Sequence, residues 1–518
     1  MKKAIVIGVL LVMASMSLAS NVSNDNSPAI NIKPLNMVVT TYQGNVQVTA
    51  TPDNEMQPVI TMDNQGRYIV AYIRSVSIME NYLDISYSED GQTWTAVAEI
   101  TTESGAATSP SIAYQPTTQR VLLSFLDPAA DYPIYGFQIV DITDLETYNG
   151  IRWGWMGGEN YNYVASGYVA DWFLQLIIND EPDYGLSQTP TLAYWTTEWE
   201  QEQDNWGLYF DGQSILKTAP ASYPDMATGT NRIMMVMQHD NETTGHSEIA
   251  YKMTVTDKDL LLTQGGGPGG MDKYSDIEVW PWQGYLGKGD FDSRCPSVSA
   301  SGSNFVVVYM SNRNGNWDIY CSYSHDDGGN WSESVVANSA DDEVYPAVYI
   351  IGNAVYCAFI KNGNLYLAKS EDGGATWGEP VKINDADGTV VEEPRAVDIT
   401  GAGIVWVDAR NGNKDIYYSP LPAPKIEISI TGGFGVKATI ANTGLEAAKN
   451  IDWSVDLSGL VFVGKHTEGT IDELAPGESV EVGPGFVFGF GPTTITVTAG
   501  GTTATASGFI LGPLVLGV

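Results

Sequence analysis

Residues 345–377 read YPAVYIIGNAVYCAFIKNGNLYLAKSEDGGATW, and this stretch decides the fold. It opens with an X-Pro pair, crosses a Gly-bearing turn into an apolar strand, turns again at Asn-Gly-Asn, and ends an alternating strand at Ser370. Residues 295–331 (CPSVSASGSNFVVVYMSNRNGNWDIYCSYSHDDGGNW) repeat this order, and residues 393–420 (EPRAVDITGAGIVWVDARNGNKDIYYSP) repeat most of it. Strand-length apolar runs between Gly- and Asn-rich turns predict successive hairpins, and a fixed repeat predicts stacked or radial units.

X-Pro pairs of the same kind occur at Gln57, Ser109, Thr189 and Tyr223, which gives seven starts in all. Proline is tolerated at the first residue of a strand, so each pair is interpreted as a strand start. Positions 295, 345 and 393 lie 50 and 48 residues apart, about the length of a four-stranded blade. The sequence therefore predicts an all-β fold, a six- or seven-bladed β-propeller, with the short spacing after Pro190 leaving the number open.

The last repeat holds only three strands before the Pro-rich segment 420–424, and residues 37–50 look like an unpaired strand. A propeller closes by pairing its two chain ends in one blade, which removes two exposed edges. We therefore predict residues 38–48 as the outer strand of the final blade. The predicted organisation is a signal peptide at 1–20, a linker at 21–36, the propeller at 37–422, and a small β-sandwich at 423–518.

The first residues have the pattern of a secretory signal: Lys2 and Lys3, an apolar run over 4–16, and the small-residue site Ser17-Leu18-Ala19. No later stretch has the length of a membrane span, so no membrane insertion is expected. We expect a secreted or extracellular protein, either free or associated with the cell surface.

The formal net charge is −37, with 62 acidic against 25 basic side chains, which disfavours nucleic acid and anionic lipid as partners. Three cysteines and four histidines without zinc spacing predict no cofactor. Calcium at the acidic segments 240–242 or 341–343 stays open, although neither has EF-hand spacing.

Three turns carry the pattern Ser-x-Asp-x-Gly-x-Thr-Trp or a close variant of it. Their carboxylates and hydroxyls can accept bonds from turn N–H groups, glycine supplies unusual backbone angles, and tryptophan buries a large area. These roles are structural, and none is catalytic. The residues are Ser88, Asp90, Gly91 and Trp94; Ser324, Asp326, Gly328 and Trp331; and Ser370, Asp372, Gly374 and Trp377.

These turns in four-stranded repeats resemble the Asp-box, or BNR repeat, of the sialidase (neuraminidase) propeller superfamily, over residues 37–422. The resemblance implies Asp-boxes between third and fourth strands, on the face opposite the active site. That superfamily contains glycosidases as well as non-catalytic, glycan-binding propellers. The segment from 423 is similar to the immunoglobulin-like modules of secreted proteins.

In that arrangement the turns after second strands and the connections between blades form the functional rim. The resemblance places a ligand-binding set of arginines there, together with an aspartate, and arginine suits an anionic ligand because its fork binds carboxylate bidentately. The candidate rim residues are Arg74, Arg294, Arg313, Arg395, Asp408 and Arg410.

The catalytic pattern of sialidases is met only in part. Arg294-Cys-Pro resembles its first arginine and Arg313 its second, which leaves Arg395 and Arg410 for the rest, and no local motif marks a tyrosine nucleophile. Six tryptophans between 151 and 206 are interpreted either as blade packing or as a platform for sugars.

Three functions follow as hypotheses: a propeller that binds glycan or protein ligands without catalysis, an exo-acting glycoside hydrolase of the sialidase type, and an architectural envelope protein. Whether the protein is an enzyme is open at this stage.

Overall fold

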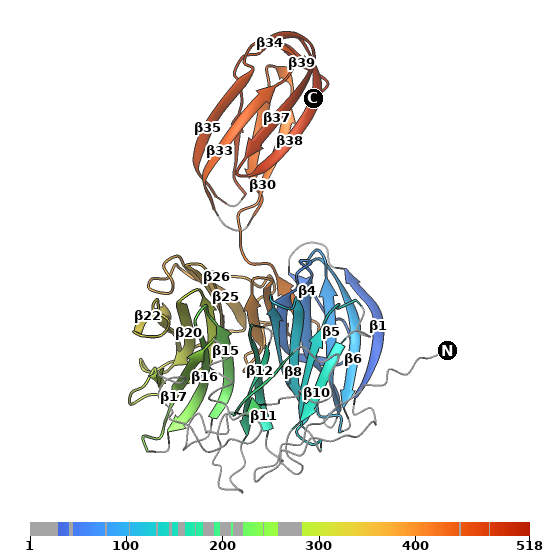
Figure 1. Ribbon diagram of the computed structural model, residues 1–518. Helices are drawn as coiled ribbons and strands as arrows, with labels where there is room; N and C mark the ends of the chain where they lie inside the picture. The colour runs from blue at the N-terminus through green and yellow to red at the C-terminus, as the bar shows by residue number, and fades with distance from the viewer. Residues whose placement is uncertain are drawn as a thin grey trace, which may run out of the picture. The chain divides into compact units, whose positions relative to one another are not determined.

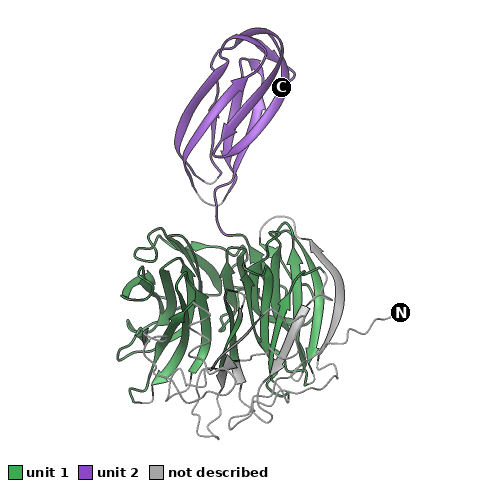
Figure 2. Cartoon of the chain, in the orientation of Figure 1, with its two compact units in different colours: residues 1–420 green, residues 421–518 purple. Residues whose placement is uncertain are grey.

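The computed structural model describes residues 30–518 apart from several gaps. These gaps are 41–44, 78–79, 103, 131–132, 144–147, 154–160, 171, 180–190, 197–208, 211–220, 242, 257–281, 445–446 and 476. The signal peptide predicted at 1–20 and most of the predicted linker lie outside the described residues. The chain divides into two compact units, residues 1–420 and 421–518 (Figure 2).

The described residues of the first unit form seven antiparallel sheets, as expected for a β-propeller. Apart from the two N-terminal strands, which pair at outer edges, the chain enters each sheet at its innermost strand and runs outward, as the sheets of β4, β8, β12 and β16 show in Figure 1. The strands of the first four sheets are β3 (Asn54–Met62), β4 (Tyr68–Ser77), β5 (Glu80–Ser88), β6 (Thr93–Thr102) and β1 (Ile30–Thr40); β7 (Thr108–Gln115), β8 (Arg120–Leu126), β9 (Ile134–Ile139) and β10 (Tyr148–Trp153); β11 (Tyr161–Val169), β12 (Trp172–Asn179), β13 (Thr191–Thr196) and β14 (Tyr209–Phe210); β15 (Ala221–Thr228), β16 (Arg232–Asn241), β17 (His246–Val255) and β18 (Trp282–Leu286).

The last three sheets have the same order. Their strands are β19 (Ser293–Ser301), β20 (Asn304–Ser311), β21 (Asp318–Ser324) and β22 (Ser332–Ala337); β23 (Glu343–Ile351), β24 (Ala354–Lys361), β25 (Asn364–Ser370) and β26 (Val381–Lys382); β27 (Val397–Thr400), β28 (Gly403–Asp408), β29 (Asp415–Ser419) and β2 (Val46–Gln47).

Five of the seven X-Pro pairs lie inside innermost strands, not at their first residues as predicted, and the pair Glu393-Pro394 lies just before β27. In β19 the pairing register shifts between Arg294 and Ser297, and Cys295 has a φ of 51°. A bulge leaves a residue out of the ladder, so a proline without an N–H fits there. The residues before proline with positive φ at such bulges are Gln57, Ser109, Tyr223, Cys295 and Tyr345.

The third sheet starts earlier than the sequence suggested. Its innermost strand is β11, which has a register shift between Tyr161 and Tyr163 but no proline. The pair Thr189-Pro190, counted as a strand start, lies outside the described residues and directly precedes the third strand of that sheet, β13. Pro190 therefore does not mark the start of the third sheet. That sheet starts at β11, earlier in the chain, which explains why the spacing from Pro190 to Pro224 looked too short.

The N-terminal segment closes the ring, but with fewer residues than predicted. Of the described residues 38–40 and 45–48, Val46 and Gln47 pair with β29 in the seventh sheet, whereas β1, which includes residues 38–40, pairs with β6 in the first. Residues 30–36, predicted as linker, belong to β1 as well. Gln47 Nε2 donates to Asp415 Oδ2 at 3.1 Å, and Val48 N donates to the carbonyl of Ile416 at 2.7 Å.

The three Ser/Asp/Gly/Trp turns join the third and fourth strands of the first, fifth and sixth sheets. In the turn at 370–377, Asp372 Oδ1 accepts hydrogen bonds from Thr376 N and Ser370 Oγ, both at 2.8 Å. Gly374 N donates to Ser370 Oγ at 2.9 Å and has a φ of 98°. The turn at 324–331 has the same bonds around Asp326. The carboxylate thus organises each turn from within.

Each of these turns also packs against the preceding sheet. Trp94 is fully buried, and its ring centroid lies 5.2 Å from that of Tyr418 in the seventh sheet. Trp331 lies 5.4 Å from Tyr251 of the fourth sheet, and Trp377 Nε1 donates to Ser334 Oγ of the fifth at 3.1 Å. The tryptophans therefore hold neighbouring sheets together.

The turn carboxylates predict sensitivity to acid. Hydrogen bonds from Asn330 lower the pKa of Asp326 to about 2, and those from Thr376 lower the pKa of Asp372 to about 2, against 3.8 ordinarily. A pKa lowered in the folded state stabilises the fold above the ordinary pKa, and this contribution is lost as the pH falls towards 2. At pH 5 the melting temperature of the wild type should exceed that of an Asp326→Asn, Asp372→Asn variant. The difference between the two melting temperatures should shrink by pH 2. An equal difference at both pH values would contradict this assignment.

The second unit consists of two antiparallel sheets with an apolar core between them. Buried side chains from both sheets, among them Ala438, Val455, Ile495 and Ile510, form that core. The strands are β30 (Ile426–Thr431), β32 (Lys437–Asn442) and β36 (Ser479–Val482) in one sheet, and β31 (Gly433–Phe434), β39 (Leu514–Leu516), β38 (Thr502–Gly512), β37 (Phe488–Ala499), β33 (Ala448–Leu457), β35 (His466–Leu474) and β34 (Leu460–Val463) in the other. The apolar C-terminal segment therefore forms strands of this unit.

Candidate functional site

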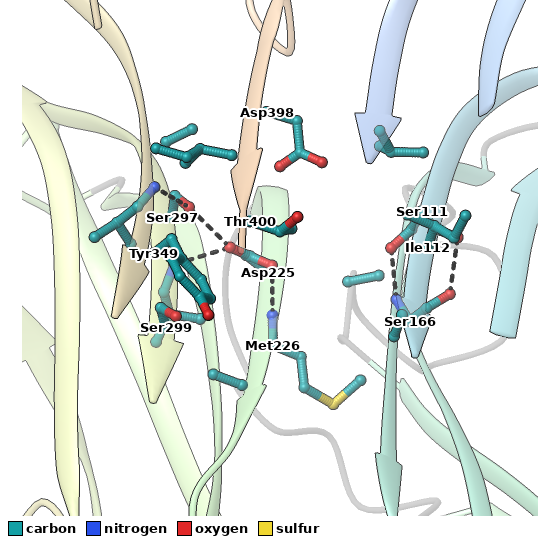
Figure 3. Close-up of a pocket in the computed structure, with 18 of the residues that line it drawn as sticks. Ser111, Ile112, Ser166, Asp225, Met226, Ser297, Ser299, Tyr349, Asp398 and Thr400 are labelled. Carbon is teal, nitrogen blue, oxygen red and sulfur yellow. Dashed lines mark hydrogen bonds between the residues drawn. The ribbon is translucent and has the colours of Figure 1, made fainter. Parts of the chain in front are cut away.

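A cavity of about 530 Å³ lies among the innermost strands of the propeller. Residues of β3, β7, β11, β15, β19, β23 and β27 line it, so every sheet contributes (Figure 3). A volume of a few hundred Å³ is typical of small-molecule sites. This central cavity is the candidate site, and it is built from one strand position repeated around the ring.

Polar side chains in the cavity wall join adjacent innermost strands. Asp225 on β15 accepts from Val298 N at 2.8 Å and from Ser297 Oγ at 3.1 Å, both on β19. Ser166 N donates to Ser111 Oγ at 2.8 Å between β11 and β7 (Figure 3). Asp398 on β27 accepts from Ile60 N at 2.8 Å, which joins the seventh sheet to the first. These side chains accept hydrogen bonds from backbone N–H groups of the neighbouring sheet.

Two of these groups are carboxylates in a poorly hydrated place. Burial raises the pKa of Asp398 to about 6, with a further contribution from the negative charge of Asp225. Burial also raises the pKa of Asp225, while the N–H donors of Val298 and Met226 lower it. The two acids therefore face a common space, and they supply hydrogen-bond acceptors to it.

Arg395 supplies the opposite charge. It follows Pro394 at the start of the seventh sheet, has a φ of 63°, and lines the cavity. Its Nη2 donates to the carbonyl of Pro110 at 2.7 Å, and its Nη1 donates to Ser109 Oγ. Those acceptors belong to the second sheet, so the side chain reaches past the first sheet. Burial lowers its pKa, and the charges of Asp225 and Asp398 oppose that shift.

Aromatic residues lie close to Arg395. Tyr223 and Tyr345, which occupy bulge positions, both line the cavity, and the rings of Tyr163 and Tyr223 are 4.9 Å apart. Burial raises the pKa of Cys295, which lines the same space, to about 12, so its thiol stays protonated. The cavity thus combines aromatic faces, acceptors and one guanidinium.

Of the six predicted rim residues, only Arg395 lines this cavity. Arg74 is buried and donates to Asp84 at 2.7 Å and to Asp53 at 2.9 Å, and it also pairs with Glu99. All three carboxylates belong to the same part of the first sheet or its entry. The guanidinium of Arg74 is therefore engaged inside its own blade.

Arg313 and Arg410 follow the same plan in other blades. Arg313 pairs with Glu333 through both Nη atoms and stacks 3.7 Å from the centroid of Tyr320. Arg410 pairs with Asp408 at 2.7 Å and stacks 4.0 Å from the centroid of Tyr417. Asp408 is fully buried and accepts from Trp406 Nε1 at 3.1 Å.

Arg294 is the most exposed of the predicted arginines, with 42% of its side chain accessible. It pairs with Asp292 at 2.9 Å and stacks 5.5 Å from the ring of Trp317. The predicted arginines therefore do not gather around one ligand space. Arg74, Arg294, Arg313 and Arg410 each pair with a nearby carboxylate instead.

A Tyr–Glu pair lies beside Arg313. Tyr309 Oη donates to Glu333 Oε2 at 2.5 Å. The Tyr309 side chain is fully buried within the core shared by the fourth and fifth sheets, and burial with the adjacent Glu333 raises its pKa far above the usual range. Such a phenol neither ionises at neutral pH nor meets a substrate.

Asp318 and Asp415 brace the turns that carry these arginines. Asn314 and Asn316 donate to Asp318, and Asn411 and Asn413 donate to Asp415 in the same pattern. The amides of Asn316 and Asn413 also bond to carbonyls of the connection that enters the next sheet. These repeated polar contacts fix the spacing between blades.

Within the described residues no three His, Cys, Asp or Glu side chains are grouped as a metal site. Near the segment 341–343, the Asp341 carbonyl and Asp342 Oδ1 accept from Asn316 and Trp317. Among the described residues, no helix is long and apolar enough to span a membrane. The tryptophan-rich region 151–206 lies partly in the gaps, and its six tryptophan side chains are outside the described residues.

The residues that sequence reasoning missed are Tyr223, Tyr345, Asp225 and Asp398. Three of them flank the prolines that were used only as strand markers. At three of the bulges the residue before proline lines the cavity, namely Tyr223, Cys295 and Tyr345, so these X-Pro pairs held a signal for the site.

No protein-family model and no curated protein matches the chain. Among solved structures, an ulvan lyase of a polysaccharide lyase family matches with a TM-score of 0.43 and 9% identity, over 72% of this chain and 95% of that one. The propeller domain of the Trilobed protease from Pyrococcus furiosus matches with a TM-score of 0.37 and 10% identity, over 72% of this chain and 95% of that one. The Cps50 (Swd1) propeller domain from Myceliophteria thermophila matches with a TM-score of 0.41 and 12% identity, over 74% of this chain and 100% of that one. From its own sheet order, the chain is an all-β protein with a β-propeller and a second two-sheet unit.

Proposed function

We propose that this protein is a secreted or cell-surface propeller that binds a glycan without catalysing its cleavage, and that the glycan end enters the central cavity beside Arg395. The observation that carries the proposal is the composition of the cavity wall. It offers tyrosine rings, two carboxylates and a guanidinium within about 530 Å³. Sugars need this combination, since their hydroxyls both donate and accept and their apolar faces stack on aromatic rings.

Membership of the sialidase-like superfamily remains part of this proposal. The three Ser/Asp/Gly/Trp turns and their hydrogen bonds support it. Catalysis has less support, because Tyr309 is buried and protonated while Arg74, Arg313 and Arg410 are paired with carboxylates. Glycoside hydrolysis by the sialidase route needs an accessible nucleophile with free arginines around it.

A glycan array with the full chain tests the proposal, followed by calorimetric titration of the retained sugars. Tyr345→Ala should weaken binding at least ~10-fold, because aromatic residues are typical hot spots. Tyr82→Ala is the matched control, since Tyr82 is a partly buried tyrosine of β5 that does not line the cavity. Equal losses in both variants, or no retained glycan, would overturn the proposed site.

Catalysis is tested separately with a fluorogenic sialoside. We expect no release above that of an Arg313→Ala variant. Turnover by the wild type that this variant loses would favour the exo-glycosidase instead.

A further inference from the structure

The second unit carries an exposed apolar row across five strands of its larger sheet. Cross-strand pairing places Leu460 beside Phe490, Phe490 beside Leu511, Leu511 beside Leu514, and Leu514 beside Phe434. Their exposed fractions are 66%, 48%, 53%, 39% and 70% in the order Leu460, Phe490, Leu511, Leu514, Phe434. The row crosses β34, β37, β38, β39 and β31, a width of about 19 Å at the usual strand spacing.

Further apolar side chains widen this row into a face. Phe509 pairs with Leu516 beside it, and Val463 pairs with Phe488. The rings of Phe434, Phe486, Phe488 and Phe490 form a chain with successive centroids 6.3, 6.5 and 5.5 Å apart. All of these residues are exposed. We call the five residues of the row and these neighbours the apolar face.

The apolar face is not a displaced core. Along β37, β38 and β39 the side chains alternate, so Ile495, Ile510 and Val515 point into the buried core while their neighbours point outward. Solvent-facing strand positions ordinarily carry polar residues. At the other end of the same strands the outward positions are indeed threonines, such as Thr503 and Thr505. The apolar side chains are thus confined to one end of the outer surface.

Charge also distinguishes this face. The whole chain has a net charge of −37, yet residues 482–518 contain no Asp, Glu, Lys, Arg or His. From the exposed fractions and typical side-chain areas, the exposed apolar area is on the order of 1,000 Å². A stable protein interface buries about 800 Å² on each partner, and patches larger than a few hundred Å² mark interaction sites.

We propose that the apolar face is the interface through which two copies of this chain form a symmetric dimer. The same face on both copies is self-complementary when two flat sheets pack about 10 Å apart. Each copy buries its phenylalanines and leucines against the other without bringing charged side chains together. An anionic bilayer fits less well, because a chain of net charge −37 is repelled by it. This proposal is independent of glycan binding by the propeller.

Sedimentation equilibrium of the full chain tests the interface. At micromolar concentrations we expect a dimer, whose stability rises or stays constant with added NaCl, since the face has no ion pairs to screen and the net charges repel. A Phe490→Ser, Leu511→Ser variant should dissociate at least ~10-fold more readily. An Ile351→Ser, Val381→Ser variant is the control, because both residues are exposed apolar side chains of the first unit.

Four outcomes overturn the proposal. The first is a wild-type chain that stays monomeric at about 100 µM, a concentration at which interfaces of this size associate. The second is a dimer that resists the Phe490 and Leu511 substitutions. The third is a dimer that the control variant weakens equally. The fourth is a monomer that floats with phosphatidylcholine vesicles, because the face would then bind lipid. A single cooperative thermal transition of the Phe490→Ser, Leu511→Ser variant shows that it folds, since both side chains are exposed in one copy.

Discussion

Replacement of Arg74 by methionine is expected to lower the free energy of unfolding of the propeller by about 3–5 kcal/mol. The guanidinium lies between Asp53, Asp84 and Glu99, and 10% of its side chain is exposed. Methionine fills a similar volume but removes the positive charge that these carboxylates share. Breaking a buried ion pair from one side is costly because the remaining charge stays in a poorly hydrated place.

Urea unfolding measures this loss, with Arg294→Met as the control. Arg294 also pairs with a carboxylate, Asp292, but its side chain is 42% exposed. Exposed ion pairs contribute about 0–1 kcal/mol, so the control should unfold close to the wild-type midpoint. If both variants shifted the midpoint by the same amount, the buried network around Arg74 would not have the role assigned to it.

Substitution of Trp94 by alanine is expected to cost a similar amount, about 3–5 kcal/mol, by leaving a large cavity. The side chain is fully buried and packs against Tyr418, so the cavity lies between the first and seventh sheets. The loss should therefore weaken the closure of the ring as well as one blade.

Trp377→Ala is the matched control, since Trp377 occupies the same position in the turn at 370–377 but is only partly buried. It should shift the urea midpoint less, because part of its surface already contacts water. A larger loss for Trp377 than for Trp94 would show that position within the turn, and not burial at the seam, determines the effect.

Local patterns were sufficient to predict much of the fold. The Ser/Asp/Gly/Trp turns lie between third and fourth strands as expected, because their hydrogen bonds span two to four residues and are written in the sequence itself. The N-terminal closure was predicted only in part. Residues 46–47 and 38–40 were predicted as one strand, yet they pair with different sheets. Local sequence patterns do not indicate which distant strand a segment pairs with.

The predicted site shows a second limit of local patterns. Arginines could be placed at the ends of second strands, but their partners could not. Glu333 reaches Arg313 from a strand two further along, and Asp385 reaches Arg410 from the preceding sheet. A count of arginines therefore overestimated the free positive charge at the rim, while the cavity residues beside the prolines were overlooked.

The seam between β2 and β29 has a consequence for how the protein assembles. Gln47 and Asp415 are separated by 368 positions along the chain. Contacts of such long range form late, because bringing distant segments together costs conformational entropy before any bond rewards it. During synthesis the segment at 46–47 must wait until nearly the whole propeller has emerged. A chain that terminates early would therefore leave a strand of the seventh sheet with an unpaired edge. Such an edge can pair with a strand of another molecule.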